Sequence, residues 1–170
     1  KEGRDVAVLF GDGAGAVIVG PSEDPKRGIL SIHLHADGRY ADILRLEIWD
    51  ISKKPYITHQ SLEEGRQYPK MVGKEVFRVA VTKIPEVIHE ALQANNLKVE
   101  DIDFFLPHQA NLRINQYAAQ QLGVPQEKFR NNIQRYGNTT AASLPLLLSE
   151  LLEEGALREG NLILDRKRTR

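Results

Sequence analysis

The 170-residue chain contains no cysteine at all, which excludes disulfide bonds and thiolate metal ligands. Basic and acidic residues balance at 23 each, so no excess of either charge points to a nucleic acid or to a membrane surface. No apolar run approaches the roughly 18–20 residues that a membrane span needs. These absences predict no nucleic-acid partner and no membrane association.

Histidine is the other side chain that commonly binds metals, and only five are present. His33 and His35 alternate in one apolar segment, and the other three stand alone with few carboxylates nearby. We therefore expect no metal site. The first residues carry no signal-peptide pattern, and 41% hydrophobic with 27% charged residues is typical of a globular protein. These features favour a cytoplasmic, metal-free α/β protein.

Apolar runs near the start of the chain predict three buried strands. The first two, at residues 6–10 and 14–19, are separated by Gly11-Asp12-Gly13, which is typical of a tight turn. Residues 29–35 form the third predicted strand. The polar stretch 21–28 lies before it and is the best internal boundary.

A long helix is predicted from Met71 to the pair Asn95-Asn96, because apolar residues recur there at helical spacing. Pro85 lies inside this stretch and should kink the helix or begin a second one. Before the helix, residues 39–70 show weak periodicity. We interpret them as an excursion that covers or borders a site.

Short strands and helices alternate after the long helix. Residues 102–106 are the next predicted strand, and 111–122 are a helix that Gly123 stops. A short strand at 131–135 follows.

A leucine-rich helix comes next, which Thr139 or Thr140 should cap and Gly155 should end. Residues 161–164 begin a final strand. The last six residues, 165–170, form a charged tail.

Strands that alternate with helices predict right-handed crossovers and a mixed, mostly parallel sheet flanked by helices on both faces. Ligands of such sheets bind beyond the carboxyl ends of the strands. His108 and Asn138 each follow a predicted strand. The pattern therefore predicts a site that contains both residues.

Two motifs carry most of the functional information, PHQAN at 107–111 and GNTTAAS at 137–143. The glycine turn at 11–13 and the segment HLHADG at 33–38 accompany them. Together they resemble β-ketoacyl-acyl-carrier-protein synthase III, a condensing enzyme of the thiolase superfamily. The resemblance extends from about Val8 to Leu164.

The resemblance implies a thiolase-like fold, which is built from two similar halves. Residues 1–27 would be the last two strands of the N-terminal half, and 28–164 the C-terminal thiolase-like domain. Residues 165–170 would be a charged tail unlike the family. The cysteine-bearing half and the final strand of the family would then lie outside this sequence.

The family transfers an acyl group from coenzyme A to a cysteine and condenses it with malonyl-acyl-carrier protein after decarboxylation. The resemblance implies that His108 and Asn138 donate hydrogen bonds to the thioester oxygen, where negative charge develops. An asparagine amide donates without titrating, and a neutral imidazole donates in one tautomer. Coenzyme A and phosphopantetheine thioesters would be substrates, with no cofactor. Because the chain lacks cysteine, we expect no condensation by the chain alone.

Structural interpretations exist for each of these residues. His108 could be a core histidine bonded to a backbone carbonyl, and Asn138 could be a turn residue, because Gly-Asn pairs tolerate left-handed backbone. The agreement of the two motifs favours the functional interpretation. Asp37 could be a base, although a turn-capping carboxylate is the simpler interpretation. The glycines at 11–15 lack nucleotide-loop spacing, and we interpret them as structural.

Basic residues around the predicted site entrance would attract an acidic carrier protein and the phosphate on its arm. By resemblance Arg78 and Arg113 are the stronger candidates, and Asn111 would contact the pantetheine arm. The other members of this group are Lys74, Lys128, Arg130 and Arg135. An ordinary solvated surface is the alternative.

We therefore expect a fragment of an acyltransferase that initiates fatty-acid biosynthesis, with acyl carrier protein and acyl-coenzyme A as partners. A related polyketide-type condensing enzyme is one alternative, because the residues that choose the acyl group would lie outside this chain. A non-catalytic module that binds carrier protein or coenzyme A is another. Family members are dimers, and an uncovered sheet edge favours self-association, so we expect a homo-oligomer.

Overall fold

The computed structural model describes residues 4–25 and 27–166. In chain order the elements are α1 (Arg4–Ala7), η1 (Gly38–Ile43), β1 (Leu44–Arg45), α2 (His59–Glu63), β2 (Lys70–Met71), α3 (Gly73–Ala94), η2 (Val99–Asp101), β3 (Phe104–Pro107), α4 (Leu112–Leu122), α5 (Ile133–Tyr136), η3 (Thr140–Ala142), α6 (Ser143–Glu153) and β4 (Ile163–Arg166). The predictions for residues 1–3, 26 and 167–170 lie outside the described residues.

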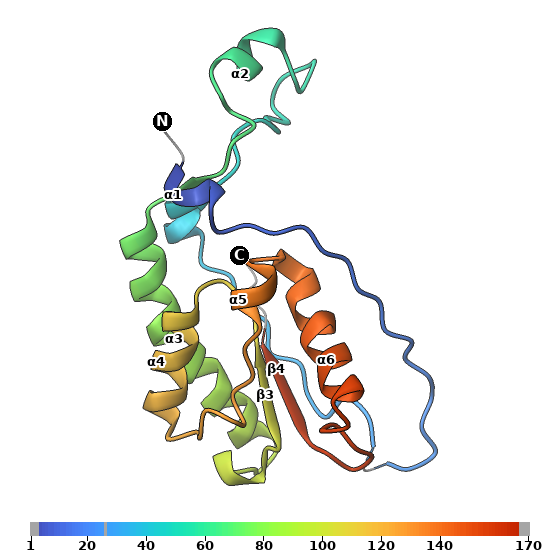
Figure 1. The fold of residues 1–170 in the computed structure, drawn as a ribbon. Helices are drawn as coiled ribbons and strands as arrows, with labels where there is room; N and C mark the ends of the chain where they lie inside the picture. Colours follow the sequence, from blue (N-terminus) through green and yellow to red (C-terminus); the bar gives the residue numbers. More distant parts are fainter. Residues whose placement is uncertain (1–3, 26, 167–170) are drawn as a thin grey trace.

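The centre of the fold is a parallel pair of strands, β3 and β4, in register from Phe104↔Ile163 to Pro107↔Arg166. Figure 1 shows α3 and α4 on one side of this pair and α6 on the other. Phe105 packs among residues of α3 and α4, whereas its neighbour Leu106 packs against α6. Successive side chains of a strand point to opposite faces, so one short strand serves two cores. The predicted parallel sheet between two helical layers is confirmed.

The long predicted helix is confirmed as α3. Its buried side chains recur every four residues, at Ala80, Ile84, Ile88 and Leu92. The helix continues through Pro85 as one element, so the predicted second helix does not form. The next predicted helix is confirmed as α4, with Asn111 as N-cap and Gly123 as a left-handed C-cap at φ 65°.

The three strands predicted near the start of the chain do not form. The first predicted strand overlaps α1, and in the described residues its only remaining pairing is a bridge from Phe10 to Asn138. A strand needs a neighbouring backbone to pair with, and among the described residues neither 14–19 nor 29–35 pairs with another segment. Their apolar side chains are therefore exposed, Ile18 completely. The glycine turn closes no hairpin.

Residues 131–135, predicted as a short strand, contain α5 instead. The cause is the buried side chain of Gln109, whose Oε1 accepts the N–H groups of Asn132 at 3.0 Å and Ile133 at 3.1 Å. The first N–H groups of a helix have no partner within it. An acceptor from outside therefore stabilises the start of α5.

Two further predictions near the C-terminus were wrong. Neither Thr139 nor Thr140 caps α6, because η3 leads directly into it and Ala142 precedes it without a side-chain hydrogen bond. The charged tail begins inside a strand, because β4 continues through Asp165 and Arg166. Pairing with β3 extends the strand in spite of its charged residues.

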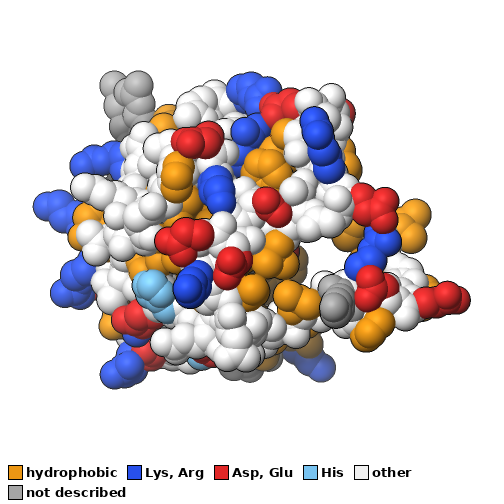
Figure 2. Space-filling view, turned by 90° about the horizontal axis from the view of Figure 1, so that it is seen from below, with side chains coloured by type: hydrophobic (Ala, Val, Ile, Leu, Met, Phe, Trp, Pro, Cys, Tyr) orange, Lys and Arg blue, Asp and Glu red, His pale blue; other side chains and the backbone are white. Residues whose placement is uncertain are grey.

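The excursion expected at residues 39–70 lies within the segment from η1 to β2. β1 and β2 pair antiparallel, and α2 lies beyond them, away from the sheet (Figure 1). Basic and acidic side chains are interspersed on the face of the molecule shown in Figure 2. That face therefore has no large patch of a single charge. No helix of the described residues is long and apolar enough to cross a membrane.

Candidate functional site

A groove of about 2410 Å³ separates the N-terminal extended chain from the helical body. Its walls include residues 28–38, one face of α3, the start of α6 and all of β4. The excursion borders it through η1 and β1, as predicted. Four of the five predicted site residues line this groove: His108, Asn111, Arg113 and Asn138.

His108 lies immediately after β3. Its main-chain N–H donates to the carbonyl of Arg166 at the end of β4, at 2.8 Å. Its half-buried ring approaches α6, with Nδ1 2.9 Å from Ser143 Oγ. The sheet thus positions the backbone of His108, and α6 positions its ring. This contact of Nδ1 is to a hydroxyl, whereas an ordinary core histidine was expected to bind a backbone carbonyl.

Asn138 is held through both its main chain and its side chain. Its N–H donates to Leu9 O at 2.8 Å, and its carbonyl accepts the N–H of Gly11 at 3.1 Å. Its Oδ1 accepts the N–H of Thr140 at 3.0 Å. Because a backbone donor occupies Oδ1, the amide orientation is set, and Nδ2 is the atom that can donate to a ligand. The turn role and the donor role therefore use different atoms of one side chain.

Hydrogen bonds connect the two motifs. The Ser143 hydroxyl donates to Thr140 O at 2.8 Å, and the N–H of Thr140 binds Asn138 as described. Thr140 has φ of 52°, a left-handed backbone that β-branched residues rarely adopt. Such strained positions concentrate at functional sites. The path from His108 through Ser143 and Thr140 to Asn138 therefore passes through a strained turn.

Gly11, Gly13 and Gly15 press an extended stretch of chain against the turn before α6. A Cβ at Gly11 would lie 2.0 Å from the carbonyl oxygen of Tyr136, and one at Gly15 would lie 2.4 Å from Cγ of Pro145. A spacing of two residues places these glycines on one face of extended chain. Their role is structural, as predicted, and it is exerted directly beside the site.

Gln109 and Ser143 are functional-site neighbours whose roles are not evident from the sequence. Gln109 is completely buried, and its Nε2 donates to Pro107 O at 2.9 Å while its Oε1 holds the start of α5. Ser143 is also buried. In each motif the sequence shows a polar residue, Gln109 or Ser143, beside apolar or small residues. It does not show the hydrogen-bond partners of that residue, because several of those partners lie far away in the sequence.

Lys74 and Arg113 are the two predicted entrance cations that line the groove. The Arg113 guanidinium lies over the ring of Phe77, 6.0 Å from its centroid. The N–H of Arg113 donates to Asn111 Oδ1 at 3.0 Å. Asn111 is therefore the N-cap of α4, and its Nδ2 is the atom that can contact a ligand.

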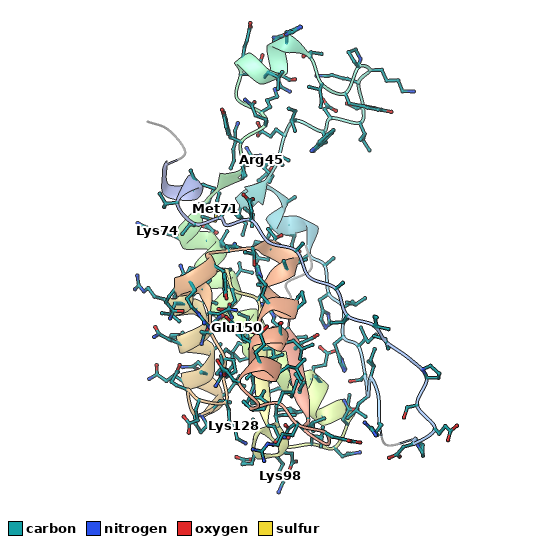
Figure 3. All side chains as sticks on the ribbon, turned by 45° about the vertical axis from the view of Figure 1, so that its right-hand side comes forward. Arg45, Met71, Lys74, Lys98, Lys128 and Glu150 are labelled. Carbon is teal, nitrogen blue, oxygen red and sulfur yellow. The ribbon has the colours of Figure 1, made fainter. Side chains whose placement is uncertain are left out.

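The other predicted entrance cations are not among the groove-lining residues. Arg78 is exposed and pairs with Glu75 at 2.9 Å. Figure 3 shows Lys128 near the opposite end of the body from Lys74. Three of them bind carbonyls or carboxylates elsewhere: Lys128, Arg130 and Arg135. The groove wall instead has three cations that were not predicted there: Arg45, Lys83 and Arg166.

Two carboxylates border the groove and have lowered pKa values. Asp37 caps η1 by accepting the N–H of Arg39 at 3.1 Å, and the Arg39 guanidinium lowers the pKa of Asp37 to about 2. This favours the capping interpretation over a base. Glu90 of α3 binds His33 at 2.9 Å and His35 at 2.7 Å, and these bonds hold the pKa of Glu90 below its usual value. In residues 4–25 and 27–166, no group of three or more His, Cys, Asp or Glu side chains is arranged so that it could hold a metal ion.

Two models of one protein family match the chain. The model described as 3-oxoacyl-[acyl-carrier-protein (ACP)] synthase III matches residues 1–38, and the model of its C-terminal part matches residues 92–165. The second range contains both His108 and Asn138. The boundary expected between residues 27 and 28 stays a prediction.

Relatives extend the match over nearly the whole chain. β-Ketoacyl-[acyl-carrier-protein] synthase III of Yersinia enterocolitica is 46% identical over 96% of this chain and 47% of its own length. The crystal structure of 3-oxoacyl-[acyl-carrier-protein] synthase III from Aquifex aeolicus matches with a TM-score of 0.80 and 41% identity, over 95% of this chain and 47% of that one. The priming β-ketosynthase of the R1128 polyketide pathway matches with a TM-score of 0.74 and 38% identity, over 95% and 47%. The chain spans about half the length of these relatives and has the expected thiolase-like α/β fold. It belongs to the 3-oxoacyl-[acyl-carrier-protein] synthase III family.

Proposed function

We propose that this chain is the part of a β-ketoacyl-acyl-carrier-protein synthase III that supplies hydrogen-bond donors for decarboxylative condensation. The observation that carries the proposal is the placement of His108 and Asn138 in one groove, connected through Ser143 and Thr140. An acyl-coenzyme A starter and malonyl-acyl-carrier protein would be the substrates. The reaction would begin fatty-acid biosynthesis in the cytoplasm and needs no cofactor.

The donors would act on the malonyl thioester. The bond between its carboxylate carbon and its α-carbon breaks, carbon dioxide leaves, and the electron pair remains as a thioester enolate. Negative charge collects on the thioester oxygen, and the loss of one donor aimed at such an oxygen typically costs about 3–4 kcal/mol. Asn138 suits this role because Thr140 already occupies its oxygen and leaves Nδ2 to donate. His108 would be the second donor.

Condensation needs one more group. The enolate carbon attacks the carbonyl of an acyl-cysteine, a carbon–carbon bond forms, and the cysteine thiolate leaves. This chain has no cysteine. We therefore expect the 170-residue chain to show no condensation, and to decarboxylate malonyl thioesters slowly.

Carrier protein and coenzyme A would approach along the groove. Both have a phosphate on a pantetheine arm, and Lys74 and Arg113 are two of the cations on the groove wall that would attract it. Asn111 would bind the amides of the arm through Nδ2. Arg78, exposed on α3 outside the groove, would contact the surface of the acidic carrier protein.

A polyketide-type priming synthase is the second candidate. The R1128 priming β-ketosynthase is 38% identical to this chain, close to the 41% of the Aquifex enzyme. The part of the two relatives that this chain matches would then be compatible with different acyl starter groups. A non-catalytic module that binds carrier protein is the third candidate, and tight carrier-protein binding without any decarboxylation would favour it.

Self-association is also part of the proposal. The segment from residue 14 to residue 35 exposes several large apolar side chains: Val17, Ile18, Val19, Ile29, Ile32 and Leu34. Exposed apolar surface and unpaired extended backbone both favour association. We expect light scattering to show a mass above that of the monomer, and a monomer mass at every concentration would contradict the proposal.

Release of carbon dioxide from malonyl-coenzyme A tests the proposed chemistry. The wild-type chain should turn over faster than His108→Ala. The matched control is His89→Ala, because His89 is exposed on α3 and is not among the groove-lining residues. Turnover that is undetectable, or equal in wild type and His108→Ala, would overturn the proposed role of His108.

A further inference from the structure

The Ser143 hydroxyl has three polar neighbours in a buried position. Its Oγ lies 2.8 Å from Thr140 O, 2.9 Å from His108 Nδ1 and 3.3 Å from the main-chain nitrogen of Gln109. Only 1% of the residue is exposed to solvent. Each of these contacts must therefore be satisfied within the protein.

Counting protons assigns the direction of every bond. A carbonyl oxygen only accepts, so the single hydroxyl proton of Ser143 must point to Thr140 O. The Gln109 nitrogen is a backbone N–H and only donates, so it uses one lone pair of Oγ. The second lone pair faces His108 Nδ1, which must then carry a proton.

The opposite assignment is less favourable. If Ser143 donated to Nδ1, its oxygen would face Thr140 O at 2.8 Å with no proton between the two atoms. Two oxygen atoms would then meet at hydrogen-bond distance with their lone pairs facing each other, which is repulsive. The geometry therefore selects one tautomer of the ring.

We propose that Ser143 is a positioning residue that holds the proton of neutral His108 on Nδ1. The proton count that supports this assignment uses only main-chain groups and one hydroxyl. In this tautomer Nε2 carries the lone pair of the neutral ring. Proton exchange between His108 and a substrate then takes place at Nε2.

The consequence for the reaction rests on the proposed function. A ring with its proton on Nδ1 cannot donate from Nε2 while it is neutral. His108 would have to bind a second proton before it could donate to the thioester oxygen, whereas the Asn138 amide donates in every state. The two donors would therefore not be equivalent, because under this proposal His108 donates only as an imidazolium.

Long-range proton–nitrogen NMR of the chain labelled with ¹⁵N-histidine tests the assignment. The ring signals of His108 are identified by their absence in His108→Gln. We expect the neutral ring of the wild type to show the Nδ1–H pattern. In Ser143→Ala the Nδ1 partner is lost, and the population should shift toward Nε2–H.

Ser149→Ala is the matched control, because Ser149 is exposed on the same helix and binds Glu153. It should leave the His108 pattern unchanged, and Ser143→Thr, which keeps the hydroxyl, should retain Nδ1–H. A wild-type ring in the Nε2–H form overturns the proposal even if Ser143→Ala fails to fold. A folded Ser143→Ala with an unchanged pattern overturns it as well. The spectrum needs no turnover, so a chain that fails to decarboxylate malonyl-coenzyme A leaves this test intact.

Discussion

Under the proposed function, one side chain, that of Asn138, would serve the backbone through Oδ1 and a substrate through Nδ2. Its Oδ1 closes a turn by accepting from Thr140, so the amide cannot rotate without losing that bond. The Nδ2 group is thereby aimed without any partner of its own in the turn. A motif of this kind places a donor at low cost in conformational entropy, because the turn that carries it is already ordered.

Replacing Asn138 with aspartate separates the two roles. Asn138→Asp keeps an oxygen that can accept from Thr140 but removes the donor and adds negative charge next to the developing enolate. We expect the fold to survive and malonyl-coenzyme A decarboxylation to fall by about 10²-fold or more. Asn96→Asp, at an exposed left-handed position after α3, should leave the rate unchanged. Equal losses in the two variants would argue against a donor role.

Asp37 provides a pH test of the cap on η1. Its folded pKa of about 2 lies below the ordinary value of 3.8, because its bonds to Arg39 favour the charged form. A depressed carboxyl pKa contributes stability that is complete above the ordinary value and is lost as the pH falls through the folded value. We expect an NMR titration to place Asp37 near 2 and to return it toward 3.8 in Arg39→Ala. An unchanged titration in that variant would mean that Arg39 is not the cause.

At the residue scale, the sequence motifs singled out His108 and Asn138 because each was expected to follow a strand. Both line one groove, although Asn138 follows the helix α5 and not a strand. The motifs could not predict the partner of His108. The hydroxyl of Ser143 reaches it only after α6 packs against β3, and that packing depends on contacts across about thirty-five residues of chain. The role of Gln109 could not be predicted for the same reason, because its partners Asn132 and Ile133 are more than twenty residues away.

At the scale of the elements, Gly11, Gly13 and Gly15 bring the N-terminal extended chain into close contact with the segment around Asn138. The main chain at Gly11 lies against the carbonyl of Tyr136, and its N–H donates to Asn138 O, so the two backbones meet directly at this position. A side chain of any size would separate them. Position 11 therefore requires glycine for close approach.

Gly11→Ala should break this contact. The new Cβ would meet the Tyr136 oxygen at 2.0 Å, and the N-terminal chain would have to move away from the site. We expect a loss of about 1–3 kcal/mol in the free energy of unfolding and faster hydrogen exchange at the Asn138 amide. Gly20→Ala is the control, because a Cβ there has nothing within 4 Å. Slow exchange at Asn138 in Gly11→Ala would show that the contact is not required.

Helices were predictable at this scale and several strands were not. The buried face of α3 recurs at a spacing that the sequence displays directly. A strand depends on a neighbour that the local sequence does not contain. Residues 29–35 illustrate this. His33 and His35 bind Glu90 of α3, and Ser31 binds Asn95, the C-cap of that helix. The apolar side chains between them are exposed: Leu30, Ile32 and Leu34.

At the scale of the whole molecule, the three layers predicted from alternating strands and helices are present around β3 and β4. The same layers bring the ends of both strands to one groove, where His108 and Asn138 meet segments from the first forty residues. The size of that groove could not be predicted, because its far wall is the extended chain that was expected to be part of a sheet. The site is therefore assembled by the fold as a whole.

The most direct test of this account is a double-mutant comparison of malonyl-coenzyme A decarboxylation. Wild type, His108→Ala, Asn138→Ala and the double variant are measured under identical conditions. If both side chains stabilise one oxygen in one groove, the double variant should lose much less than the product of the two single losses, because groups that act as a unit are not additive. Losses that multiply fully, or turnover that is the same in all four proteins, would contradict a shared site.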